Sequence, residues 1–119
     1  MKTNSFTKER FLKRFSNASE GVELKSVDLF RSNARLTLAF LSLQLGLINT
    51  HVYVGDLGES FPSMRLEGRT KSGETTSVFL IVREGKLVFA YSENQGKSYS
   101  IEPDPELLLE TLTLLICQK

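Results

Sequence analysis

The stretch LTLAFLSLQLGLINTHVYVG, from Leu36 to Gly55, contains no Asp, Glu, Lys or Arg, although 24% of the chain is charged. A run this apolar is expected inside the fold, because burial removes its surface from water. Leu36, Leu38 and Phe40 alternate with Thr37 and Ala39, and after one skip the alternation resumes at Leu41. This two-residue period predicts a β-strand over residues 35–47, with a β-bulge at the skip.

A helix over the same residues is the alternative. Ser32 or Asn33 would cap it, and Gly46 would end it after Leu45. The strand is preferred because a helix would place Thr37 and Gln44 on one side and Ser42 nearly opposite, which leaves no coherent polar face. A further strand over 22–30 would then pair with it through the turn at 31–34.

An N-terminal helix is predicted over residues 8–18, with Thr7 as N-cap, Phe6 and Phe11 clamping the first turn, and Gly21 as its end. Further strands are expected at His51–Val54, Met64–Thr70, Thr76–Arg83, Lys86–Ser92 and Lys97–Ile101. Most turns between them are short, so neighbours should pair antiparallel. The 119 residues therefore predict a single α+β domain, with an N-terminal helix, a curved antiparallel sheet of about six to seven strands and a C-terminal helix packed on it.

Two of these strands are apolar on both faces, namely Val78–Val82 and Leu87–Tyr91. An antiparallel strand with one face in water would instead alternate apolar and polar residues. Both sides of this hairpin are therefore expected to be covered.

The C-terminal helix begins clearly, with Asp104 as N-cap and Pro105 at the first helical position. Leucines then occupy so much of its circumference that one sheet face would not hide them all. Either the sheet curls around the helix or a second subunit completes its cover. The residues expected at such an interface are Leu108, Leu112, Leu115 and Ile116.

Composition narrows the class of protein further. Fifteen basic and fourteen acidic residues nearly cancel, so no overall field steers the chain toward nucleic acid or anionic lipid. The single cysteine, Cys117, cannot form an intramolecular disulfide, and residues 1–14 are too charged for a secretory signal. The purely apolar part of the central run, about 13 residues, is shorter than the roughly 20 that a membrane helix needs. A cytoplasmic protein without a membrane span is expected.

No motif identifies a reaction, and neither a cofactor nor a metal is predicted. His51 is the only histidine, and with Tyr53, Asp56 and Glu59 it could line the mouth of a ligand pocket. The simpler interpretation places His51 at a strand end beside a solvated loop.

Four cations on the N-terminal helix, Lys8, Arg10, Lys13 and Arg14, could contact phosphates. An ordinary solvated helix face is the preferred interpretation, because Phe11 and Phe15 serve better in the core than as stacking platforms. A nucleic-acid partner is therefore disfavoured.

From Val78 to Ile116 the chain has a hairpin turning at Glu84-Gly85, a short strand, and Asp-Pro-Glu opening a leucine-rich helix. This third of the chain resembles the C-terminal end of type III secretion chaperones. The resemblance implies a dimeric protein-binding module. The expected function is thus a non-catalytic protein–protein interaction or regulatory module, in the form of a homodimeric, chaperone-like adaptor. A small-molecule-binding or enzymatic domain with a pocket near His51, Asp56 and Glu59, and a weak nucleic-acid binder, are the alternatives.

Overall fold

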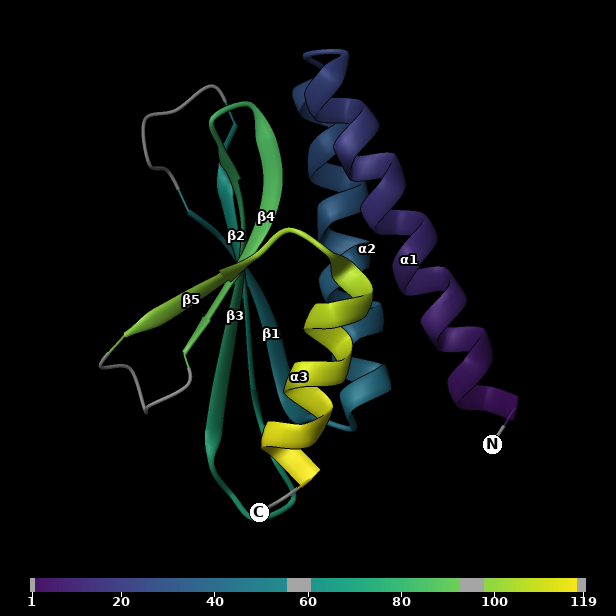
Figure 1. Ribbon diagram of the computed structural model, residues 1–119, viewed down its shortest axis with the longest axis vertical. Helices are drawn as coiled ribbons and strands as arrows, with labels where there is room; N and C mark the ends of the chain where they lie inside the picture. The colour runs from purple at the N-terminus through teal and green to yellow at the C-terminus, as the bar shows by residue number, and fades with distance from the viewer. Residues whose placement is uncertain (1, 56–60, 93–97, 118–119) are drawn as a thin grey trace.

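The computed structural model describes residues 2–55, 61–92 and 98–117. Figure 1 shows the order of elements in these parts of the chain: two long helices, five strands and a final helix. Their bounds are α1 Lys2–Glu23, α2 Val27–Leu45, β1 Ile48–Gly55, β2 Ser63–Arg69, β3 Thr75–Arg83, β4 Lys86–Ser92, β5 Tyr99–Glu102 and α3 Pro105–Cys117.

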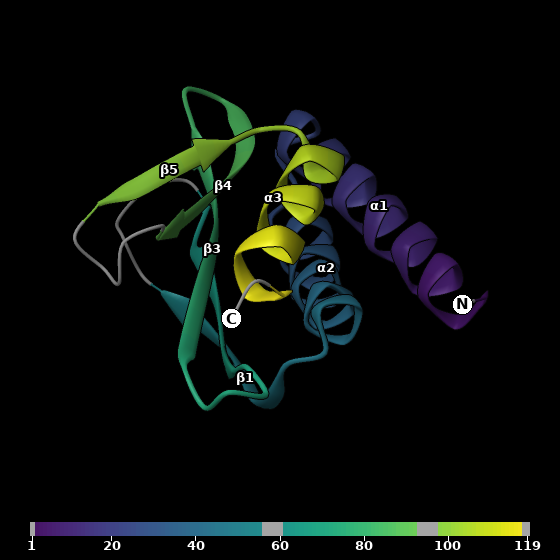
Figure 2. The ribbon, with the colours of Figure 1, turned by 60° about the horizontal axis from the view of Figure 1, so that its bottom comes forward.

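The five strands form one antiparallel sheet in the order β1-β2-β3-β4-β5, so each strand pairs with its neighbours in the chain. All three helices lie on the same face of this sheet (Figure 2). We call this the inner face and the opposite one the outer face. The α+β class and the two terminal helices are confirmed, whereas the predicted six to seven strands are reduced to five.

The strand predicted over residues 35–47 is wrong, because these residues belong to α2. Ser26 caps this helix by accepting the Leu29 N–H at 3.2 Å, and Gly46 ends it in the left-handed conformation. The hydroxyl groups of Thr37 and Ser42, whose positions disfavoured a helix, form hydrogen bonds within α2. Thr37 donates to the Asn33 carbonyl at 2.7 Å, and Ser42 donates to the Ala39 carbonyl at 2.8 Å. A coherent polar face was therefore not required.

The N-terminal helix is longer than predicted at both ends. Because α1 begins at Lys2, Thr7 lies inside it and is not its N-cap. Gly21 does not end α1 either: a Cβ there would lie 2.6 Å from the Phe30 nitrogen, so this glycine lets α1 and α2 approach closely. Since the chain stays helical through Glu23 and α2 starts at Val27, the strand predicted over 22–30 is also absent.

The turn between α1 and α2 is a Schellman motif. Ser26 N–H donates to the Gly21 carbonyl at 2.9 Å and Lys25 N–H to the Val22 carbonyl at 3.1 Å. The left-handed position of such a motif favours glycine, but here it is occupied by Lys25 with φ of 56°.

The strands from residue 63 onward lie close to the predicted ranges. The start of α3 is confirmed as well, since Asp104 Oδ1 accepts the N–H groups of Glu106 and Leu107 at 2.9 and 3.3 Å. The core lies between the inner face and the helices, where the rings of Phe15 and Phe89 stack at 5.1 Å.

Candidate functional site

The outer face carries a row of side chains that crosses all five strands. Register pairing aligns one residue from each strand, in the order Tyr53, Arg65, Phe79, Ala90 and Ile101. Paired residues in adjacent strands project on the same side of a sheet, so the row is continuous. We call it the outer-face row.

Aromatic contacts tie this row together. The Arg65 guanidinium lies 4.6 Å from the centre of the Tyr53 ring, and Phe79 meets Tyr99 edge to face at 5.8 Å. Tyr99 and Ile101 remain 54% and 41% exposed. In the part of the chain that the structure describes, no helix covers this face (Figure 2). On this face Val88 and Ala90 of β4 are nevertheless buried, each at 7% exposure, whereas Phe79 and Ile81 of β3 are partly buried. The prediction that both faces of the β3–β4 hairpin are covered is therefore confirmed for β4 and holds in part for β3.

Two of the predicted ligand residues lie at one edge of the outer face. His51 and Tyr53 are exposed on β1, with ring centres 6.0 Å apart. The other two, Asp56 and Glu59, lie outside the described residues. The structure therefore places His51 and Tyr53 side by side on an open strand surface.

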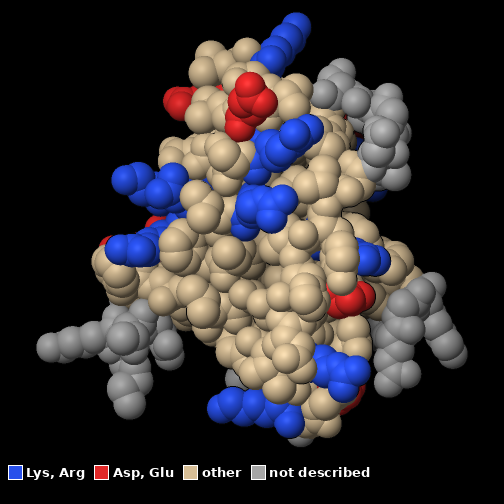
Figure 3. Space-filling view, turned by 180° about the vertical axis from the view of Figure 1, so that it is seen from behind, with Lys and Arg blue, Asp and Glu red and all other residues tan. Residues whose placement is uncertain are grey.

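The basic residues of α1 contact different helices. Lys8 pairs with Glu106 of α3 at 3.5 Å, whereas Arg14 donates to the Asn33 Oδ1 of α2 at 3.3 Å. Arg10 lies over the Phe6 ring at 4.1 Å, and Lys13 is exposed. The structure thus separates Lys8, which faces α3, from Arg10, Lys13 and Arg14, whose spacing places them on one side of α1. Of these three, Arg10 and Arg14 contact α2 through Phe40 and Asn33. On the face drawn in Figure 3, Lys and Arg likewise form separate groups divided by uncharged surface.

The leucine-rich helix α3 mostly completes the protein's own core. Of the predicted interface residues, Leu108 and Leu112 are 0% and 3% exposed, and Leu115 and Ile116 are partly buried. The large apolar side chains that α3 exposes to solvent are Leu107 and Leu114, at 48% and 60%.

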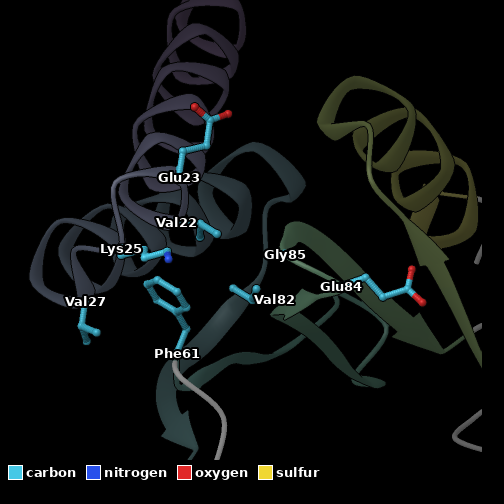
Figure 4. Close-up of a pocket in the computed structure, with 8 residues that line it drawn as sticks. All are labelled: Val22, Glu23, Lys25, Val27, Phe61, Val82, Glu84 and Gly85. Carbon is cyan, nitrogen blue, oxygen red and sulfur yellow. The ribbon is translucent and has the colours of Figure 1, made fainter.

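A pocket of about 680 Å³ opens between the α1–α2 turn and the β3–β4 turn. Figure 4 shows the Lys25 ammonium directed toward the Phe61 ring and Val82, while the carboxylates of Glu23 and Glu84 point away from it. The remaining lining residues are Val22, Val27 and Gly85. Sequence reasoning missed this site, because its residues come from separate turns and no motif connects them.

Comparison with known proteins supplies no assignment: no protein-family model, curated protein or solved structure matches this chain. Among the described residues, no three His, Cys, Asp or Glu side chains are placed to hold a metal ion. Within the same residues, no helix combines the length and apolarity needed to cross a membrane.

Proposed function

We propose that the protein is a non-catalytic interaction module that forms a homodimer through the outer faces of two sheets. The observation that carries this proposal is the set of exposed apolar side chains on the outer face, where Tyr53, Tyr99 and Ile101 are 42%, 54% and 41% exposed and no helix of the described chain lies over the strands. Exposed apolar side chains gain free energy when they leave water. A second copy supplies this cover by sheet-on-sheet packing, as in β-sandwiches.

The outer-face row suits a two-fold arrangement because it pairs a large residue with a small one. Phe79 and Ala90 are register partners on β3 and β4. A two-fold axis between these strands would place Phe79 opposite Ala90 of the partner subunit, and the reverse contact would follow by symmetry.

The size of the outer face is sufficient for a specific contact. Five strands about 4.8 Å apart, with about seven residues rising about 3.3 Å each, give a face of about 550 Å². Because Val88 and Ala90 are already buried in the monomer, two such faces bury at most about 1,100 Å², close to the roughly 1,000 Å² expected of a biological interface. The proposed dimer is therefore a reversible one. With its lone cysteine, the protein suits a reducing compartment such as the cytoplasm.

The experiment measures mass by sedimentation equilibrium between about 1 and 100 µM, the range expected for such an interface. Wild type should approach the dimer mass, and Phe79→Asp and Ile101→Lys should be monomeric because each buries an unpaired charge at the contact. Ile101 is already 41% exposed, so its substitution leaves the monomer fold intact.

The matched control is Leu114→Asp, which adds a charge on the helix side of the molecule. It should leave the dimer unchanged. A monomeric wild type at the highest concentration would refute the proposal, and so would loss of the dimer in Leu114→Asp with its retention in Ile101→Lys.

A further inference from the structure

The pocket beside the α1–α2 turn has the features of a binding site for a small molecule, independently of the outer face. We propose that it binds an apolar molecule with a single carboxylate, such as a medium-chain or aryl-alkyl carboxylic acid. Lys25 pairs with the carboxylate, and the aliphatic and aromatic walls hold the apolar body.

The walls of the pocket are anchored to the core. Phe61 packs edge to face on the fully buried Phe30 at 5.2 Å, and Val22 is only 7% exposed. Val82 also packs against the core cluster. These contacts hold the walls in place without ligand, and a volume of about 680 Å³ falls in the range typical of small-molecule sites.

Charge determines which apolar ligand fits. Lys25 forms no ion pair with any described residue, and its ammonium is the charged group that Figure 4 shows turned toward the apolar walls. Glu23 and Glu84 direct their carboxylates away from it. An anionic head at the exposed Lys25 with an apolar tail against Phe61 and Val82 therefore matches the pocket, because a hydrogen bond between charged groups is stronger than one between neutral groups.

The backbone supplies an independent argument. Among the described residues, three that are not glycine have a positive φ: Lys25, Asn49 and Glu84. Asparagine tolerates this conformation, but lysine and glutamate are strained in it. Both strained residues line this pocket. The positive φ of Glu84 belongs to the two-residue turn between β3 and β4, and its carboxylate points away from the pocket. At Lys25, whose ammonium faces the walls, strain that a glycine would relieve fits a site where the side chain is needed despite its cost in stability.

Because glycine relieves this strain, the variant Lys25→Gly distinguishes a role of Lys25 in binding from a role in stability. Lys25→Gly relieves the backbone while removing the ammonium, so its melting temperature should rise by about 3–6 °C. Its affinity for octanoate and for 4-phenylbutanoate should fall at least about tenfold. Both affinities come from amide shifts in nitrogen-15 NMR titrations of the full chain, read at Val22, Lys25 and Val82.

Three controls make the outcome specific. Glu84→Asn relieves the other strained turn, so it should also raise the melting temperature but should retain octanoate binding. Lys25→Met keeps an apolar side chain of similar length and should lose the preference for octanoate over uncharged 1-octanol. Ile101→Lys, which breaks the proposed dimer, should bind octanoate like wild type. This control therefore tests the pocket independently of the dimer.

The proposal is overturned if neither carboxylate gives saturable shifts at these residues up to about 10 mM. Equal binding of octanoate and 1-octanol by wild type, or undiminished carboxylate binding by Lys25→Gly, would overturn it as well.

Discussion

Gly21 is the residue that sets how closely the two long helices approach. The Phe30 nitrogen and Cα would lie only 2.6 and 2.9 Å from a Cβ at this position. Both are backbone atoms, so no side-chain rotation can relieve the contact. The glycine is therefore selected by contact between helices rather than by a helix end.

We predict that Gly21→Ala destabilises the fold by about 1–3 kcal/mol, because α1 and α2 must separate to admit the methyl group. This is the net loss, which remains after the roughly 1 kcal/mol that alanine gains in helix propensity. Urea unfolding measures the change, with Ser16→Ala on the exposed surface of α1 as the near-neutral control. A Gly21→Ala variant more stable than wild type would contradict the close approach.

A buried polar side chain of helix α2 is hydrogen-bonded within the helix itself. Thr37 is fully buried, yet its hydroxyl donates to the Asn33 carbonyl one turn back. Leu38 and Leu41 face the core, whereas Leu36 and Leu43 are exposed. Leucine on every side therefore produced an alternating pattern that predicts a strand, although the buried residues follow the helical spacing.

We predict that Thr37→Val changes the free energy of unfolding by less than about 1 kcal/mol. The Asn33 carbonyl keeps its helical partner, and the two side chains have nearly the same shape. Thermal and urea unfolding measure the change, and Leu38→Ala, which removes fully buried volume, should lose about 2–5 kcal/mol. A loss of that size in Thr37→Val would mean that the hydroxyl stabilises more than its own helix turn.

At the scale of the whole molecule, all three helices lie on one face of the sheet, and no helix lies over the outer-face row, in which Tyr53 and Ile101 are exposed (Figure 2). This one-sided arrangement is the physical basis of the proposed dimer.

We predict that the melting temperature of wild type rises with protein concentration, because only the folded chain dimerises. A tenfold increase in concentration should raise it by about 2–3 °C. Calorimetry at two concentrations measures the shift, and Ile101→Lys should show none. A melting temperature that is independent of concentration in wild type would count against self-association.

The sequence by itself determined the α+β class, the four strands from residue 63 onward and the cap of α3. Their signals are local: turn residues between apolar runs, and Asp104 before Pro105. Only the tertiary structure decided that residues 27–45 are helical, because leucine suits either period and the choice depends on which side chains meet the core. It also decided that Lys25 faces Phe61 and that Tyr53 aligns with Ile101, since contacts between distant segments follow from strand register and helix packing.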